Sequence, residues 1–80
     1  MKLPRDVSGS QLIKALRSLG YEVSRQSGSH IRVTTIVNGS HHVTVPKHDP
    51  LKLGTFASIL DDVATHHNLS RDGLLKLLNL

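Results

Sequence analysis

Hydrophobic and polar positions along this chain of 80 residues follow first a helical spacing and then a strand spacing. Between residues 7 and 19, large apolar side chains recur every three or four positions, and the helix face they define carries Leu12, Ile13, Leu16 and Leu19. Ser8 and Gln11 have the spacing of a capping box, and Gly20 is a typical residue just after a helix end. The pattern therefore predicts a first helix over residues 7–19.

Alternation with a period of two follows this helix and predicts three strands. Residues 21–26 form the first strand, with Tyr21, Val23 and Arg25 on one side. Residues 30–37 form the second, whose apolar side carries Ile31, Val33, Thr35 and Val37. The pair Asn38-Gly39 is a strong hairpin signal, so residues 40–46 are expected to form a third strand antiparallel to the second.

The faces of this hairpin depend on the length of its loop. A two-residue loop at Asn38-Gly39 would pair Val37 with Ser40 and put the apolar residues of the two strands on opposite faces. A loop adjusted by one residue, with Gly39 left-handed in a bulge, gathers Ile31, Val33, Val43 and Val45 on one face. We prefer this register because a small sheet must cover the core with one face. The outer face then carries His30, Arg32, Thr34, His42 and Thr44, with residues 46–48 near His30.

Helical spacing returns after Pro50. Residues 52–65 predict a second helix, whose apolar stripe consists of Leu53, Phe56, Ile59, Leu60 and Val63. Ser70 can cap a last short helix through Leu80, with apolar side chains at Leu74, Leu75, Leu77 and Leu78. We expect a single core that includes Leu16, Val33, Val45, Phe56 and Leu60. The order helix, three strands, helix, helix predicts an α+β fold with an antiparallel sheet.

Ten lysine and arginine residues against six aspartate and glutamate residues give a formal charge of +4, which favours an anionic partner such as nucleic acid. The chain has no cysteine, which excludes a disulfide framework and a thiolate zinc site. Its two aromatic residues, Tyr21 and Phe56, are too few for a base-stacking platform. No apolar run approaches the ~20 residues that span a bilayer, and no signal peptide is recognisable. We expect a cytoplasmic protein with no membrane partner.

The candidate chemistry lies in residues 25–33, where a loop of small residues becomes a strand. Gly28 allows close approach of a ligand, and Ser29 offers a hydroxyl and an amide donor. His30 can exchange protons near neutral pH, and Arg25 and Arg32 flank it with positive charge. This combination suits a phosphodiester. The alternative for these residues alone is a loop with a surface histidine.

The order and spacing of several motifs resemble the HicA-type (YcfA-like) mRNA interferase toxins over nearly the whole chain. The matching fragments are Leu3-Pro4, Ser8-Gly9, Gly20-Tyr21-Glu22, Arg25-Gln26, Gly28-Ser29-His30, Val45-Pro46 with His48, and Leu53-Gly54-Thr55-Phe56 with Ile59-Leu60. One departure is Arg32, since many members carry a second histidine near the first. The resemblance implies a double-stranded-RNA-binding-domain-like fold, with residues 1–80 as one HicA-like domain and residues 69–80 as its C-terminal helical extension.

The resemblance also implies a function: toxins of this family cleave mRNA without a metal or another cofactor, and a HicB-type antitoxin neutralises them. The family's catalytic histidine corresponds to His30. We expect His30 to transfer a proton while the RNA contacts come from Arg25, Gly28, Ser29, Arg32, Lys47 and His48. The oligomeric state stays open, with a free monomer as one reading.

Two other functions compete with the nuclease. The first is a non-catalytic RNA-binding module of the same fold, in which His30 only contacts the ligand. The second is a metal site built from His41, His42, His48, His66 and His67. Adjacent histidines on a strand point to opposite faces, and His66-His67 end a helix far along the chain, so the sequence gives little support to a metal site.

Overall fold

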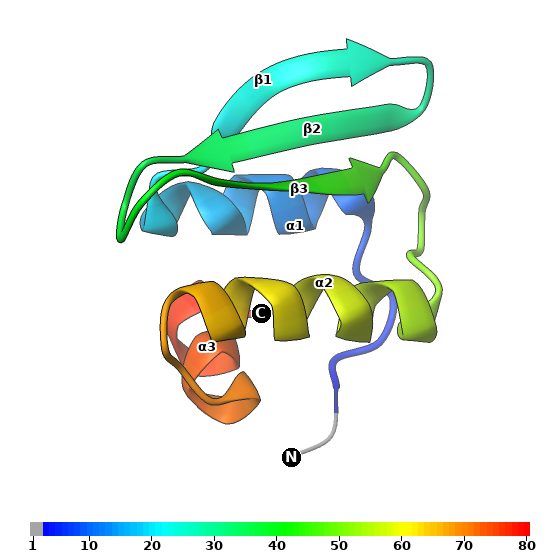
Figure 1. Cartoon of the computed structure of the whole chain (residues 1–80). Coiled ribbons are helices and arrows are strands. Elements are labelled where there is room, and N and C mark those ends of the chain that lie inside the picture. The colour runs from blue at the N-terminus through cyan, green and yellow to red at the C-terminus, as the bar shows by residue number, and fades with distance from the viewer. Residues whose placement is uncertain (1–2) are drawn as a thin grey trace.

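Helices cover one face of a three-stranded antiparallel sheet, and no helix lies over the other face in the described chain (Figure 1). This computed structural model describes residues 3–80. The elements are α1 (Gly9–Leu16) with a 3₁₀ turn η1 (Arg17–Leu19), β1 (Glu22–Ser27), β2 (His30–Thr35), β3 (His41–Pro46), α2 (Leu53–His66) and α3 (Arg71–Leu78). The strand order is β1-β2-β3. The fold is α+β and double-stranded-RNA-binding-domain-like, as predicted.

The ends of α1 form as the sequence predicts. The Ser8 hydroxyl accepts the Gln11 amide at 3.0 Å, while the Gln11 side chain accepts the Ser8 amide at 2.8 Å. Regular α-helix ends at Leu16, three residues earlier than predicted, and η1 completes the segment. Gly20 then takes the left-handed conformation (φ 83°), where a Cβ would lie 2.8 Å from the Thr35 hydroxyl. Glycine is therefore required there by conformation and by space.

The register between β2 and β3 confirms the predicted faces. Val33 lies opposite Val43, and Ile31 opposite Val45. The loop is longer than predicted, however, because β2 ends at Thr35 and β3 begins at His41. Gly39 is left-handed as expected, but Ile36 is 85% exposed and Val37 lies beyond the strand, so placing Val37 on the buried face was wrong. The five-residue turn over residues 36–40 bonds part of its backbone locally, with the Gly39 amide donating to the Ile36 carbonyl.

One apolar core lies between the sheet and the helices. It contains all five residues expected there: Leu16, Val33, Val45, Phe56 and Leu60. Two leucines of the predicted apolar stripes differ, because Leu53 and Leu77 are 42% and 45% exposed. Leu53 is the first residue of α2 and Leu77 borders a groove between α3 and α1, so neither side chain is buried in the core.

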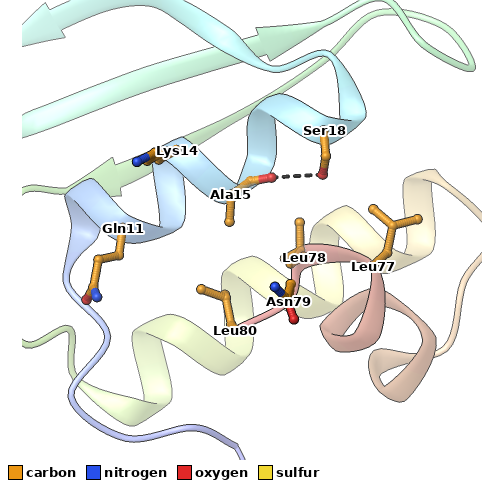
Figure 2. Close-up of a pocket in the computed structure, with 8 residues that line it drawn as sticks. All are labelled: Gln11, Lys14, Ala15, Ser18, Leu77, Leu78, Asn79 and Leu80. Atoms are coloured by element: carbon orange, nitrogen blue, oxygen red, sulfur yellow. Dashed lines mark hydrogen bonds between the residues drawn. The ribbon is translucent and has the colours of Figure 1, made fainter.

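The C-terminal helix α3 packs on α2 rather than on the sheet. Ser70 caps it by accepting the Gly73 amide at 3.0 Å, and Arg71 forms a two-pronged ion pair with Asp61 of α2. A groove between α1 and the end of α3 is lined by Gln11, Lys14, Ala15, Ser18 and residues 77–80 (Figure 2). None of the predicted site residues lines this groove. Within residues 3–80, no helix has the length and apolar character needed to cross a membrane.

Candidate functional site

His30 lies at the junction of a tight turn and a strand, as the sequence predicts. Ser27 and His30 are paired across β1 and β2, so Gly28 and Ser29 alone form the connection. Gly28 adopts φ 59°, in the left-handed region that glycine enters without cost. A Cβ at Gly28 would meet nothing within 4 Å, so the turn requires glycine for its backbone and not for space. His30 is exposed at the first position of β2.

The outer face of the sheet carries polar side chains on all three strands. His30, Arg32 and Thr34 alternate along β2, and β3 contributes His42 and Thr44 opposite Thr34 and Arg32. Ser24 of β1 extends this face, because its hydroxyl lies 2.7 Å from the Thr34 hydroxyl. No helix of the described chain covers these residues (Figure 1), so the face is open to a large ligand.

Arg25 lies on this outer face, contrary to the simple alternation predicted for the first strand. The ladder pairs Val23 with Val33 but Arg25 with Arg32, so a bulge occurs at Ser24. A bulge inserts one extra residue and reverses the alternation beyond it. Arg25 therefore lies on the opposite face from Val23 and directly opposite Arg32. Arg32 is two residues from His30 along β2 and shares its face.

The positive charges at this face are not neutralised within the described residues. Arg25, Arg32 and Lys47 form no ion pair with a carboxylate anywhere in residues 3–80. Like charges directly opposite on neighbouring strands destabilise a sheet, so the Arg25–Arg32 pair costs stability unless an anion binds. Arg32 also donates from Nη2 to His42 Nε2 at 3.0 Å, which requires a His42 nitrogen without a proton.

Lys47 and His48 follow the end of β3 at the same corner of the molecule. Pro46 is paired with His30, and the Lys47 amide donates to the Ser29 carbonyl at 2.6 Å. The His48 carbonyl in turn accepts the Gly9 amide at 2.9 Å. The structure thus brings together all the predicted site residues, namely Arg25, Gly28, Ser29, His30, Arg32, Lys47 and His48.

A second group of histidines lies at the other end of the sheet, where His41, His66 and His67 meet although His66 and His67 are far along the chain from His41. The Tyr21 hydroxyl lies 2.7 Å from His41 Nδ1 and 3.1 Å from His67 Nε2. His66 stacks on His41 with the ring centroids 4.3 Å apart, and its Nε2 lies 3.0 Å from the Val37 carbonyl. We call Tyr21, His41, His66 and His67 the histidine cluster.

The hydrogen bonds of the histidine cluster form a directed chain. The Asn38 amide donates to His67 Nδ1, so the proton of His67 is on Nε2 and is donated to Tyr21. Tyr21 then donates to His41 Nδ1, and His41 Nε2 donates to Asp62 at 3.1 Å. The Asn38–His67 bond needs a neutral imidazole at His67, and the Tyr21–His41 bond needs a protonated phenol at Tyr21.

The surroundings of the cluster shift two pKa values. Burial, with a smaller effect of the Asp62 charge, raises the pKa of Tyr21 to about 12. Burial also lowers the pKa of His67 below its ordinary value, and the nearby His66 and His41 lower it further. Both shifts favour the uncharged forms of Tyr21 and His67, as their hydrogen bonds require. Among residues 3–80, no group of three or more histidine, cysteine or acidic side chains has a metal-binding arrangement.

Sequence comparison assigns most of the chain to one family. The sequence model of a family described as the HicA toxin of bacterial toxin–antitoxin systems matches residues 9–64. That range covers more than half of the chain, from the first residue of α1 almost to the end of α2, and includes the whole sheet; α3 lies outside it. Comparisons with curated proteins and with solved structures found no match.

Proposed function

The chain belongs to the HicA family of bacterial toxin–antitoxin toxins, and from this premise we propose that it is a metal-independent endoribonuclease whose proton carrier is His30. The observation that carries the proposal is the position of His30. It is an exposed imidazole on the open face, beside a Gly-Ser turn and two arginines that form no ion pair with a carboxylate of the described chain. We also propose that residues 1–80 act as one HicA-like domain, with residues 69–80 as its helical extension.

RNA supplies the nucleophile in this reaction. The 2′-hydroxyl oxygen bonds to the neighbouring phosphorus and loses its proton, while the bond from phosphorus to the 5′-oxygen breaks and that oxygen gains a proton. His30 acts in this transfer as the general base or the general acid, because an imidazole can do either near neutral pH. A single proton carrier of this kind contributes ~10²–10⁴-fold, so we expect slow turnover.

Positive charge stabilises the phosphorane-like transition state. Arg25 and Arg32 lie opposite each other next to His30, and the anion that would relieve their repulsion is the RNA backbone. The Ser29 hydroxyl and the Gly28–Ser29 amides are further donors at the turn. Lys47 and His48 approach from the end of β3 and extend the cationic surface along the bound strand.

We propose a HicB-type antitoxin as the protein partner. Its neutralising surface is expected to be acidic and to cover the His30 face, since that is where the cations without carboxylate partners gather. The association should weaken as salt rises, because exposed charges are screened. An antitoxin footprint restricted to α3, with His30 left open, would contradict this part of the proposal.

The test is RNA cleavage by purified His30→Ala and His30→Gln, with thermal unfolding measured in parallel. Both variants should keep the fold and most of the RNA affinity and lose ~10²-fold or more of the cleavage rate. His42→Ala, which removes another exposed imidazole from the same face, should lose much less. A wild-type chain that binds RNA and leaves it intact would instead identify the alternative, a non-catalytic RNA-binding module of this fold.

A further inference from the structure

The first residue of α1 lies against the backbone that follows β3. A Cβ built on Gly9 would overlap the carbonyl oxygen of Pro46 and lie 3.3 Å from Lys47 Cα. The overlapping atom belongs to the main chain, so no side-chain rotation can make room for it. Gly9 has ordinary helical geometry and does not belong to the positive-φ residues. Glycine is therefore required at position 9 because a side chain would clash with the Pro46 backbone, and not because of its own backbone conformation.

Three main-chain hydrogen bonds hold the segment after β3 in this position. The Lys47 amide donates to Ser29 at 2.6 Å, the His48 carbonyl accepts from Gly9 at 2.9 Å, and the Leu51 amide donates to Val7 at 2.8 Å. We call residues 46–48 with their bonds to Ser29 and Gly9 the backbone staple. It links the turn that precedes His30 to the N-terminus of α1, a helix whose Leu12, Ile13 and Leu16 belong to the core.

We propose that Gly9 is a positioning residue for RNA cleavage: its missing side chain lets α1 press the backbone staple against the Ser29–His30 turn and fix Lys47 and His48 there. This inference rests on the proposed function. Gly9 does not touch RNA. It acts through the position of the Pro46–His48 backbone, and therefore through the distance between His30 and the cations of that segment.

Gly9→Ala tests the proposal. The alanine methyl must push α1 and the Pro46 carbonyl apart by about 1 Å, and a misplacement of about 1 Å near a reacting group can cost 10²-fold in rate. We expect kcat to fall by about 10²-fold. KM should change much less than kcat, because Arg25 and Arg32 are on strands that the substitution does not contact and only the contacts of Lys47 and His48 are displaced.

Gly54→Ala is the matched control. Gly54 also lies in the first turn of a helix, α2, and a Cβ there would meet nothing within 4 Å. Replacing glycine by alanine raises helix propensity at both positions. The two variants therefore differ mainly in the clash with the Pro46 carbonyl, which only Gly9→Ala introduces. Gly54→Ala should keep the melting temperature or raise it slightly and should cleave RNA at the parental rate.

A second pair of variants decides the question if Gly9→Ala fails to fold. Lys47→Ala removes the charged side chain and keeps the amide that bonds Ser29, whereas Lys47→Pro removes both. If the staple positions the site, Lys47→Pro should lose at least tenfold more kcat than Lys47→Ala, with equal affinity for an uncleavable 2′-deoxy analogue of the RNA.

The outcomes separate this inference from the proposed function. A folded Gly9→Ala with the parental kcat overturns the inference while leaving His30 as the proton carrier, and so do equal rates for Lys47→Ala and Lys47→Pro. A wild-type chain that cleaves no RNA overturns the proposed function itself. Loss of kcat in Gly9→Ala and in Lys47→Pro, with Gly54→Ala active, supports both.

Discussion

The two ends of the sheet both carry histidines, and they differ in what surrounds the imidazole. At one end His30 is exposed, and its side chain forms no hydrogen bond within residues 3–80. At the other end His67 is 8% exposed, and both of its ring nitrogens have partners, Tyr21 and Asn38. An imidazole can move protons for a substrate only if its nitrogens are accessible, so the same residue type is suited to chemistry at one end and to structure at the other.

The two ends of the sheet also differ in the sign of the charges near their histidines. The His30 end has Arg25, Arg32 and Lys47 without carboxylate partners in the described chain, whereas the cluster end has Asp62 bonded to His41. Stability should therefore depend on the cluster, and RNA chemistry on the His30 end. The following predictions test this division from the largest expected effect to the smallest.

His67→Ala should cost about 2–3 kcal/mol of unfolding free energy, because it leaves a buried gap and removes two hydrogen bonds. For a domain of this size the melting temperature should fall by roughly 10 °C or more. The measurement is thermal unfolding followed by circular dichroism, with cleavage assayed well below the transition. Cleavage per folded molecule should stay at the parental level. A loss of activity as large as that of His30→Ala would show that the cluster takes part in RNA chemistry and not only in stability.

Tyr21→Phe should cost about 1–2 kcal/mol, since it leaves His41 Nδ1 and the His67 proton without their shared partner. Ser24→Ala is the control, because the Ser24–Thr34 hydroxyl pair is equally short at 2.7 Å but exposed. The midpoint of urea unfolding should be lower for Tyr21→Phe than for the parent, whereas the midpoint for Ser24→Ala should be almost unchanged. Equal shifts would mean that burial does not distinguish the two bonds.

Acid should destabilise the cluster end. The pKa of His67 is lowered in the folded state. Above the ordinary value of 6.5, His67 is therefore neutral in both the folded and the unfolded protein, and its full contribution to stability is present. As the pH falls below 6.5, His67 becomes protonated in the unfolded chain while it stays neutral in the folded protein. The free energy of unfolding therefore decreases until the pH reaches the lowered pKa of folded His67. Unfolding free energy between pH 8 and 5 measures this loss, and His67→Gln should show less of it. Histidine resonances that titrate together near 6.5 would contradict the assignment.

Arg32→Ala should have the smallest effect on stability, within about 0.5 kcal/mol, because the side chain lies on the open face. Its effect should be on RNA binding, where losing one phosphate contact lowers the salt slope by about 0.7 for a single strand. Binding titrations at several salt concentrations give this slope. An unchanged slope would remove Arg32 from the RNA contacts, and Lys76→Ala on α3 serves as a control away from the face.

Much of the fold was predictable because local patterns and burial agree. The faces of β2 and β3 followed from one requirement, that Ile31, Val33, Val43 and Val45 share the core side. The loop length did not follow, since Ile36 and Val37 continue the strand pattern in the sequence and yet lie outside the sheet. The bulge at Ser24 has no sequence signal of its own, so alternation put Arg25 on the wrong side.

The histidine cluster shows what pattern analysis omits. Adjacent histidines in β3 were correctly expected on opposite faces, but their partners come from tertiary packing. A signal was present in the element lengths. A strand of 6 residues and a helix of 14 residues each span about 20 Å, so the helix that returns after β3 ends near the start of that strand. His66 and His67 are thereby brought beside His41.

The uncovered face of the sheet has a kinetic consequence. In many enzymes a lid must open and close in each cycle, and its motion sets the rate at which product leaves. Within residues 3–80 no segment lies over the His30 face, so under the proposed function RNA would reach and leave this face without any such motion (Figure 1). The rate of RNA breakdown would then rise in simple proportion to the number of uncovered copies, and dosage would be the quantity a cell has to manage.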